Sequence, residues 1–373
     1  MDKHLHIVCL DVPYPPDYGG VFDLFYKIVA LYQQGVKLHL HCFEYGRGSQ
    51  YALNRYCVEV TYYKRRNNIK ALFHRVPYIV GSRANKKLLE NLLKDDYPVL
   101  LEGIHCTWFL YTNELSSKKV VIRLHNVEFQ YYRKLSKAAS PGIRKIYFFI
   151  ESMLLKSYER KIAGKALCVA VTTKDVQIYQ NELGVHNIKY LPVFLPFSLV
   201  NSITGHGEFC LYHGNLSVVE NEKAVFWLLN KVFTDPAIPF IIAGKNPTAK
   251  LVKFVSGKPG VTIVANPSEE VMENLIRMAH INVLPSLNET GIKIKLLNAL
   301  YNGRHCIVNK EAVEGTQLEE LCNIASGAVD FKKVLLKLVS QPFTQEDIDL
   351  RTRVLNELFD NDKNAEQLMR WIY

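Results

Sequence analysis

The sequence predicts an α/β protein made of two successive doubly wound parallel-sheet units, and three observations carry this prediction. Short apolar runs rich in Val and Ile alternate with longer segments whose apolar residues recur with the period of a helix, as in strand-helix-strand units. The alternation lapses once, between residues 192 and 207, and then resumes. The length of 373 residues exceeds one ordinary core and suits two domains of about 150 residues each.

The first unit contains seven predicted strands and five principal predicted helices. The strands are expected near 5–12, 36–43, 57–63, 98–102, 119–124, 166–172 and 187–191. The helices are expected near 21–34, 84–94, 127–137, 143–163 and 174–183. Gly35 marks the end of the first of these helices, because it stands where a left-handed C-terminal cap would.

The second unit begins after the linker and repeats the same alternation. Its strands are expected near 208–213, 238–243, 260–264, 280–284 and 304–308, and its helices near 219–233, 247–255, 269–278, 292–302 and 315–322. Only helical pattern follows, in 331–339 and 345–371. We therefore expect a first domain over 1–195, a second over 208–345, and C-terminal helices over 346–373 that pack back on the first.

Charge is distributed unevenly along the chain. Residues 1–200 contain 28 Lys and Arg against 16 Asp and Glu, a net charge of +12, whereas the remainder has 18 against 20, a net charge of −2. The first half therefore suits phosphorylated substrates, anionic lipid surfaces or nucleic acid. No helix-turn-helix, RNA-recognition or basic-zipper signature accompanies the charge, so we expect no nucleic-acid partner.

Cysteine spacing and hydropathy predict a cytoplasmic location. The eight cysteines are dispersed, without C-x-x-C or paired histidine spacing, so we expect reduced thiols and no metal site. The N-terminal apolar run is too short for a signal peptide, and no long uncharged apolar stretch follows. A complete G-x-G-x-x-G fingerprint and a Walker A motif are both absent, which disfavours nicotinamide cofactors and P-loop hydrolysis; we expect no cofactor.

Two loops of the first unit follow strands, where ligands of parallel sheets bind. Gly19 and Gly20 end a Pro-rich loop just before a helix, where backbone N–H groups can approach a phosphate; a simple tight turn is the alternative. His125 ends the strand 119–124 and can act on a substrate hydroxyl at neutral pH. Its neighbours Asn126 and Glu128 are also suited to be ordinary helix caps.

Two loops of the second unit are candidate anion sites. Lys293 and Lys295 lie in the first turn of the helix expected at 292–302, where they oppose the helix dipole. That conflict is relieved if a phosphate shares the site, although a solvated basic edge is the alternative. Gly214 and Asn215 lie in a small polar loop after the first strand of this unit and suit a diphosphate more weakly.

These motifs, in this order, resemble retaining glycosyltransferases of the two-Rossmann-domain GT-B fold, namely the family 4 group that includes bacterial mannosyl- and glucosyltransferases of surface-polysaccharide synthesis. The likeness covers nearly the whole chain. It rests on Gly19-Gly20, His125-Asn126-Val127-Glu128, His213-Gly214-Asn215-Leu216-Ser217, Ala243-Gly244-Lys245, and the segment from Thr290 to Gly303.

The resemblance implies a role for each matching residue. The donor, a nucleoside diphosphate sugar, would bind mainly the second domain, and the acceptor the first. His125 is the candidate catalytic residue, in contact with the transferred sugar, and no metal is needed because cations and helix N-termini stabilise the leaving diphosphate. The candidate donor-binding residues are Gly19, Gly20, Gly214, Asn215, Val264, Ala265, Asn266, Glu289, Thr290, Gly291, Ile292, Lys293, Lys295 and Asn298.

The chain departs from the family at two places. Many members carry an Arg and a Lys in the loop and helix after the first strand of the second domain, where this chain has Asn215 and Asn221-Glu222. The family's two glutamates, eight residues apart, are also incomplete: Thr290 and Asn298 stand in their places, with Glu289 beside the first. The residue that holds the ribose hydroxyls is therefore open, and Lys293 and Lys295 are candidates to replace the missing cations.

The resemblance predicts transfer of a hexose, with retention, to a hydroxyl of a glycan or lipid-linked sugar. One alternative is a nucleotide-sugar epimerase of the same fold, although the sequence shows no obvious convergence of carboxylates for proton abstraction. Another is a catalytically silent partner subunit, which the incomplete glutamates favour. Because acceptors of this family are often polyprenyl-linked, the basic residues of the first half also suit peripheral contact with anionic lipid at the inner face of the plasma membrane. Aromatic residues at 147–149 are suited to enter that interface or to form core.

Overall fold

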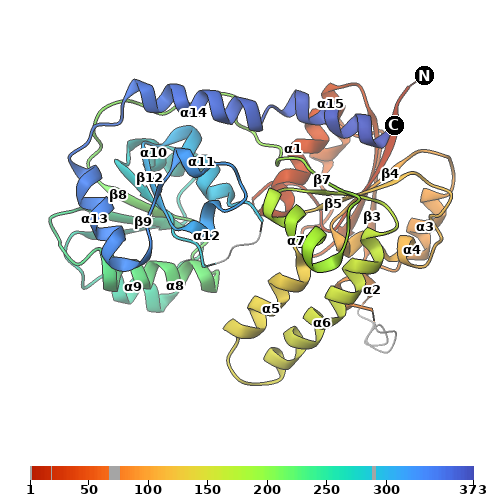
Figure 1. Cartoon of the computed structure of the whole chain (residues 1–373), viewed down its shortest axis with the longest axis horizontal. Coiled ribbons are helices and arrows are strands. Elements are labelled where there is room, and N and C mark those ends of the chain that lie inside the picture. Colours follow the sequence, from red (N-terminus) through yellow and green to blue (C-terminus); the bar gives the residue numbers. More distant parts are fainter. Residues whose placement is uncertain (1, 18, 67–75, 288–290) are drawn as a thin grey trace. The chain divides into compact units, whose positions relative to one another are not determined.

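A computed structural model describes residues 2–17, 19–66, 76–287 and 291–373. The chain forms two compact units: unit 1 comprises 1–196 and 359–373, and unit 2 comprises 197–358. The elements of both units are labelled in Figure 1. Unit 2 is therefore a single stretch of chain, whereas unit 1 is completed only by the last helix.

Unit 1 is built on a seven-stranded sheet in which every pair of neighbours is parallel, in the order β3-β2-β1-β4-β5-β6-β7. The strands are β1 His4–Cys9, β2 Lys37–Glu44, β3 Glu59–Lys64, β4 Val99–Glu102, β5 Val120–Leu124, β6 Leu167–Ala170 and β7 Ile188–Tyr190. From β1 the successive strands are added on one side of the sheet as far as β3, and from β4 onwards they are added on the other side. The loops after β1 and β4 therefore flank the switch point, where ligands of such sheets bind.

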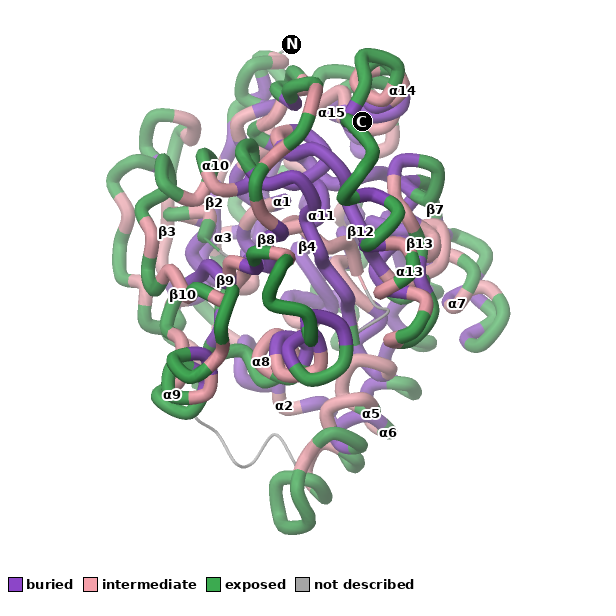
Figure 2. The backbone as a smooth tube through the Cα atoms, turned by 90° about the vertical axis from the view of Figure 1, so that its left-hand side faces the viewer, coloured by how far each residue is buried: buried purple, intermediate pink, exposed green. Residues whose placement is uncertain are grey.

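Both faces of the centre of this sheet are buried, which explains why the central strands β4 and β5 are mostly apolar, whereas β3 at the edge is more exposed. Along β1, Leu5 and Ile7 face one apolar cluster that includes Leu24 of α1 and Leu368 of α15. Val8, which points the other way, joins the cluster on the opposite face. Figure 2 shows the strands as the most continuously buried part of the backbone.

The helices of unit 1 cover these two faces. They are α1 Gly19–Gln33, α2 Tyr78–Gly81, α3 Lys86–Leu92, α4 Trp108–Tyr111, α5 Glu128–Ala138, α6 Ile143–Ala163, α7 Thr173–Leu183 and α15 Asn361–Ile372. Helix α15 packs against α1. The Asn361 amide fastens it, because it donates to Leu195 O at 2.7 Å and its oxygen accepts from Leu195 N at 3.1 Å.

Unit 2 has a six-stranded parallel sheet in the order β10-β9-β8-β11-β12-β13. The strands are β8 Cys210–His213, β9 Phe240–Gly244, β10 Val261–Ala265, β11 Ile281–Val283, β12 His305–Val308 and β13 Asn323–Ile324. The helices are α8 Val219–Trp227 with a π-helical extension Leu228–Val232, α9 Ala249–Val255, α10 Glu269–Met278, α11 Ile294–Asn302, α12 Lys310–Val313, α13 Gly327–Val339 and α14 Gln345–Leu358.

The predicted fold class, two doubly wound parallel-sheet units, is confirmed. The predicted helix at 315–322 is wrong except for one 3-10 turn at Glu319–Leu321: Gly315 and Gln317 both have positive φ, of 78° and 62°, so the backbone turns before it, and the short strand β13 follows. The C-terminal segment expected at 346–373 is divided, because α14 belongs to unit 2 and α15 to unit 1. The side chain of Asp360 caps the new helix by accepting bonds from the N–H groups of residues 362 and 363.

Candidate functional site

The predicted catalytic residue, His125, lies directly after β5 and beside two carboxylates. Its Nε2 donates to Glu102 Oε2 at 2.9 Å, and its Nδ1 is 3.7 Å from Asp23 Oδ2. Glu102 ends β4 and Asp23 lies in α1, so three separate segments bring these groups together. About 10% of the His125 side chain is exposed, whereas both carboxylates are fully buried.

Two buried cations neutralise these carboxylates. The Lys27 ammonium is 2.9 Å from Asp23 Oδ2 and 2.8 Å from Glu102 Oε1. Arg123, on β5, binds both oxygens of Asp23, at 3.1 and 3.0 Å, and also donates to the carbonyls of Leu191 and Pro192 at 2.7 Å. The five residues Asp23, Lys27, Glu102, Arg123 and His125 are called the His125 cluster below.

Electrostatics hold both acids of the His125 cluster in the ionised form. Burial disfavours the Asp23 carboxylate, but Arg123 and Lys27 outweigh it and hold the pKa of Asp23 well below its ordinary value. Burial likewise opposes ionisation of Glu102, yet Lys27 and the hydrogen bond from His125 lower its pKa. The cluster therefore presents an imidazole between two carboxylates whose charge is matched within the fold.

One oxygen each of Asp23 and Glu102 and one His125 nitrogen lie within 4.8 Å of one another, close enough to hold a metal ion. Lys27, however, contacts both carboxylates at ion-pair distance, and Arg123 holds Asp23 from the other side. A divalent cation would have to displace Lys27 from a fully buried position. The donor set fits an internal ion-pair network better than a metal site.

Gly19 and Gly20 open α1, one turn before Asp23. The preceding loop is tied down by Arg47, which donates to Pro15 O at 2.6 Å and pairs with Asp17. These glycines and the His125 cluster therefore share one helix of unit 1, and the Gly19-Gly20 turn sets where Asp23 and Lys27 enter the core.

The second predicted site begins with the loops after β8 and β9, which touch through two glycines. A Cβ on Gly244 would lie only 1.7 Å from Gly214 O, so no other residue fits there. Gly214, at φ +150°, donates its N–H to Ala243 O at 3.1 Å. This close approach brings Gly214 to the edge of α11, where the Lys295 Cδ lies 3.8 Å from the position of its missing Cβ.

Lys295, Asn221 and Asn215 form one hydrogen-bonded chain around this glycine. The Lys295 ammonium donates to Asn221 Oδ1 and to the Tyr212 hydroxyl, both at 3.1 Å. Asn221 Nδ2 in turn donates to Asn215 O at 2.9 Å. Thus the lysine of α11 reaches the side chain that stands where many family members carry their cation on α8.

The Lys295 charge has no acidic partner among the residues that the structure describes, since no carboxylate of these ranges forms an ion pair with it. Burial, and then the charge of Lys293, lower the pKa of Lys295 to about 7. An anion bound here would restore the ammonium to its ordinary range, because it would supply the missing opposite charge. Lys293 itself donates to Gly291 O at 3.2 Å.

The end of β10 is tied to the same edge. Val264 and Ala265 close the strand, and Asn266 follows at φ 50°, with its N–H donating to Gly244 O at 2.8 Å. Its side-chain oxygen accepts from Asn246 N at 2.7 Å. The predicted donor-binding segment 264–266 therefore lies beside the Gly214 and Gly244 loops.

The remaining predicted residues are placed less directly. The Asn298 side chain accepts from Asn302 Nδ2 at 2.9 Å and is not bonded to Lys295 or Gly214. Gly291 adopts a left-handed φ of 63°, and Ile292 is half-buried. Glu289 and Thr290 lie outside the described residues.

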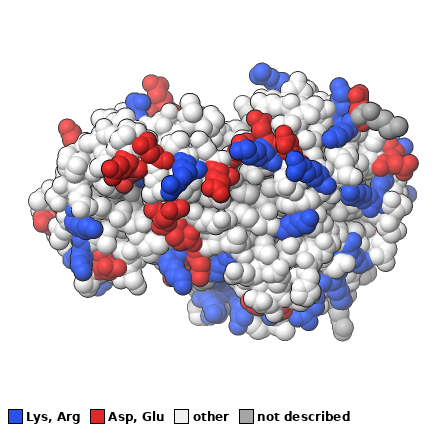
Figure 3. Space-filling view, turned by 45° about the horizontal axis from the view of Figure 1, so that its top comes forward, with Lys and Arg blue, Asp and Glu red and all other residues white. Residues whose placement is uncertain are grey.

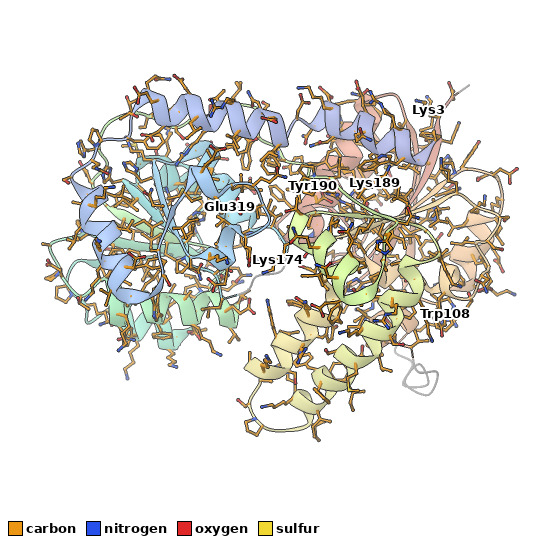
Figure 4. All side chains as sticks on the ribbon, viewed as in Figure 1. Lys3, Trp108, Lys174, Lys189, Tyr190 and Glu319 are labelled. Carbon is orange, nitrogen blue, oxygen red and sulfur yellow. The ribbon has the colours of Figure 1, made fainter. Side chains whose placement is uncertain are left out.

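A cavity of about 630 Å³ lies at the ends of β11, β12 and β13 and is distinct from the Lys295 region. Its charged lining is mostly acidic, with Glu311, Glu314 and Glu319 against Lys310; Glu319 is labelled in Figure 4. This charge disfavours a diphosphate. The Lys295 edge has the opposite character and suits the predicted anion site better than the cavity does.

Sequence reasoning missed most of the His125 cluster and also Tyr212. The available signals were charged residues inside apolar runs: Asp23 and Lys27 one turn apart in the first helix, and Arg123 inside a strand. Such residues are almost never buried unless paired. Their partners, however, come from segments about 100 residues apart, which one sequence does not connect.

The comparisons with known proteins agree with this architecture. Residues 207–339 match the family model described as "Glycosyl transferases group 1". An uncharacterized 44.6 kDa protein in the cps region of Klebsiella pneumoniae is 28% identical over 349 residues, which are 88% of this chain and 89% of that protein.

Two solved structures share the fold over essentially the whole chain. HepE of Anabaena, in complex with UDP and glucose, has a TM-score of 0.67 at 10% identity and covers 99% of this chain and 98% of its own. An α,α-trehalose-phosphate synthase (UDP-forming) of Burkholderia xenovorans, in complex with glucose-6-phosphate, has a TM-score of 0.62 at 11% identity and covers 100% of both chains. Together with the two parallel-sheet units, these likenesses confirm the GT-B fold expected from the sequence, and the family match over 207–339 supports the resemblance to group 1 glycosyltransferases.

Proposed function

We propose that this chain transfers a hexose from a nucleoside diphosphate sugar to a hydroxyl of a glycan or lipid-linked sugar, with retention of the anomeric configuration and without a metal ion. The observation that carries the proposal is the Lys295 ammonium, held beside Gly214 without an acidic partner among the described residues. A diphosphate is the anion that the fold and the family match suggest for this edge. The same cation would stabilise the leaving diphosphate as negative charge develops on it.

The lysine of α11 would supply the charge that many relatives place on the β8–α8 segment. Asn215 and Asn221 are neutral, yet Asn221 holds the Lys295 ammonium at 3.1 Å. The cation that this chain lacks on the β8–α8 segment would then be replaced by Lys295 of α11. Gly214 and the segment 264–266 would border the diphosphate and the base respectively.

The His125 cluster would act on the transferred sugar. With Nε2 donating to Glu102 and Nδ1 facing Asp23, the imidazole ring is oriented by two ionised carboxylates. Gly19 and Gly20 would contribute backbone N–H groups at the start of α1. We expect the chain to work at the inner face of the plasma membrane, in contact with anionic lipid.

The donor is tested by binding of a panel of UDP- and GDP-sugars, measured by calorimetry. We expect at least one to bind and Lys295→Ala to weaken its affinity at least tenfold, since a charge-assisted contact is lost. Lys253→Ala is the matched control, because Lys253 is an exposed lysine of the same unit. Unchanged affinity of Lys295→Ala would remove this residue from the site, and binding of no nucleotide sugar by folded protein would contradict the proposal.

The pH dependence of donor affinity tests the state of Lys295. Because its pKa in the free protein is about 7, the ammonium is increasingly lost as pH rises from 7 to 8.5. Affinity for a nucleotide sugar should therefore fall, approaching about tenfold per pH unit. Lys295→Arg, which stays charged, should give a flatter profile. A flat wild-type profile would show that the ammonium is not used.

The epimerase alternative gains one observation from the structure. Contrary to the expectation that no carboxylates converge, Asp23 and Glu102 meet at His125. Both have lowered pKa values, however, which makes them weak bases for proton abstraction. Incubation with donor alone separates the functions: an epimerase would release free sugar and UDP, whereas a transferase requires an acceptor for rapid turnover. A silent subunit would bind donor without either reaction.

A further inference from the structure

Helices α5 and α6 form a hairpin that extends from the body of unit 1. Figures 1 and 2 show the turn between them, residues 139–142, at the far end of the hairpin and largely exposed. All residues of 128–163 are described, so the surface of this hairpin is known over its whole length.

One face of α6 holds the hairpin together and joins it to the core. Leu155, Tyr158 and Ile162 are buried in the cluster on one side of the sheet. Nearer the turn, the Phe148 ring meets Tyr132 of α5 edge-on, with centroids 5.9 Å apart, and Ser152 Oγ donates to Phe129 O at 2.9 Å. The aromatic pair at 147–148 therefore serves hairpin packing, as the core alternative for these residues predicted.

The opposite face of α6 is also apolar, and it is exposed. Ile143 is 88% exposed, Ile146 is 60% exposed and Met153 is 62% exposed, with Phe149 and Ile150 also exposed between them. Their spacing of three and four residues places them on one stripe, about 15 Å long at 1.5 Å per residue. A soluble helix normally turns polar residues to this side, so a contiguous exposed stripe indicates an interaction surface.

Charge around the stripe has one sign. All three acidic residues of 128–163, Glu128, Glu151 and Glu159, are buried. The exposed charged residues are basic and surround the stripe from both helices: Arg133, Lys137, Arg144, Lys145, Lys156, Arg160 and Lys161. By contrast, acidic and basic side chains are interspersed over much of the face drawn in Figure 3.

Burial keeps the acids of the hairpin from offsetting this positive field. It raises the pKa of Glu159 to about 8 and the pKa of Glu128 to about 7. Lys156 is the member of the basic set with an acidic partner nearby, since its Nζ is 3.4 Å from Glu182 of α7. The end of the hairpin near the turn, which carries Lys137, Arg144 and Lys145, is thus the most one-sidedly basic.

We propose that the α5–α6 hairpin docks on an anionic lipid bilayer, with Ile143, Ile146 and Ile150 among the acyl chains and the flanking lysines and arginines at the headgroups. An exposed apolar stripe inside a basic rim is the chemistry of an interfacial amphipathic helix, which buries its apolar face about 5–10 Å deep. The inference goes beyond the proposed transfer reaction, because it uses no residue of the donor site and none of the His125 cluster. It assigns the membrane contact that the sequence predicts to one defined surface, the α5–α6 hairpin.

Two other occupants fit the surface less well. A second copy of the hairpin would bring two arrays of positive charge together, which opposes self-association. A protein partner would need an acidic rim around an apolar groove. An anionic bilayer offers both an apolar interior and negatively charged headgroups. No helix of the described residues is long and apolar enough to cross it.

The test is flotation of the full chain with vesicles of equal parts phosphatidylglycerol and phosphatidylcholine. We expect binding at low salt that weakens at high salt, and little binding to phosphatidylcholine alone. Ile146→Asp with Ile150→Asp should reduce binding at least tenfold, and Lys137→Ala and Lys145→Ala about fivefold each. Val329→Asp with Leu336→Asp is the matched control, because these residues form an equally exposed apolar pair on α13 of unit 2.

Each outcome decides for or against the proposal. Loss of flotation in the hairpin variants but not in the control supports it, provided that circular dichroism and donor binding are unchanged. Absence of wild-type flotation, or equal flotation of all variants, overturns it. If wild type instead sediments as a dimer that Ile146→Asp dissociates, with no vesicle binding, the surface is a contact between copies.

A second measurement places the stripe in the bilayer without relying on a disruptive change. Tryptophan introduced as Ile146→Trp should be quenched by lipids brominated on the acyl chains, whereas Leu336→Trp should not. Equal quenching of both residues would overturn the assignment to the hairpin even if the protein binds vesicles. Because donor binding is measured separately, failure of the membrane proposal leaves the proposed transfer reaction untouched, and the reverse also holds.

Discussion

The two units hold buried charge in opposite ways. In unit 1, the His125 cluster pairs two carboxylates with Lys27 and Arg123, so the fold itself satisfies its charges. In unit 2, Lys295 is held by an amide and a hydroxyl, with no carboxylate partner among the described residues. A satisfied cluster orients a side chain, in this case His125. A buried cation without an acidic partner can instead pair with an anionic ligand.

Removing a charge should therefore have opposite consequences in the two units. The largest expected effect is in unit 1, where Arg123→Met leaves Asp23 buried and half-paired and frees two carbonyls. We expect the free energy of unfolding of unit 1 to fall by about 3–5 kcal/mol. Urea denaturation of the full chain, followed by circular dichroism, measures it. Lys37→Met, at an exposed lysine of β2, is the control and should change little. A loss below about 1 kcal/mol would mean that the cluster is not held as described.

Gly244→Ala breaks the geometry of unit 2 and leaves its charges in place. The new Cβ would collide with Gly214 O, so the loops after β8 and β9 must separate. We expect about 1–3 kcal/mol of destabilisation, as in other overpacked sites, together with loss of donor affinity. Gly257→Ala, in an open turn of the same unit, is the matched control. Normal donor binding by Gly244→Ala would show that the close approach of these loops is not needed.

A third arrangement, a buried imidazole that is kept neutral, extends the comparison to the pH dependence of stability. His41 in β2 lies 2.9 Å from His6 and 2.8 Å from the Tyr63 hydroxyl. Burial, and then the charges of His6 and His39, lower the pKa of His41 to about 3. The unfolded chain binds this proton near pH 6.5, so stability should be lost as pH falls from 6.5 towards 3, by about 2 kcal/mol at pH 5.

Thermal denaturation of the full chain between pH 7.5 and pH 5 measures this loss. His41→Gln should have a shallower dependence, since the titrating group is gone. His186→Gln is the control, because His186 is exposed. Identical slopes for wild type and His41→Gln would assign the acid sensitivity to other groups.

The smallest expected effect on stability is that of Lys295→Met. Removing an uncompensated cation should leave the free energy of unfolding within about 1 kcal/mol of wild type or raise it, while donor affinity falls. Because the unfolded chain keeps its Lys295 proton up to about pH 10.4, wild-type stability should rise as pH increases from 7 towards 10. Lys295→Met should lack this rise. A large destabilisation would place Lys295 with Arg123, as a structural cation.

The sequence predicted the sheets well because parallel strands buried on both faces must be apolar throughout. Residues 167–170 and 240–244 stand out for that reason. The position of His125 at a strand end was also within reach, since strand ends are where such sheets bind ligands. Its partner Glu102 was not, because Glu102 comes to lie beside the end of β5 only through the register of β4 on β5.

Helix α6 shows a second limit of the sequence. Its apolar residues lie on two opposite faces, and one periodicity argument assigns both to the core. The core alternative for 147–149 therefore suits Tyr147 and Phe148, which are half-buried, but not Phe149, which is exposed like Ile150 and Met153. Only the structure tells which of the two faces has a covering layer. The contacts of Lys295 likewise could not be predicted from the sequence, since its hydrogen bond to Asn221 joins residues 74 positions apart.

Helix α15 gives the chain an order of assembly. Unit 2 is made of one uninterrupted stretch, so it can fold as soon as residue 358 has been synthesised. Unit 1 must wait for Leu368 and Ile372, which close one face of its sheet, although its strands emerge from the ribosome first. Until α15 has been synthesised, α1 covers this face of the sheet without its packing partner, and part of the apolar cluster below His125 stays open to water.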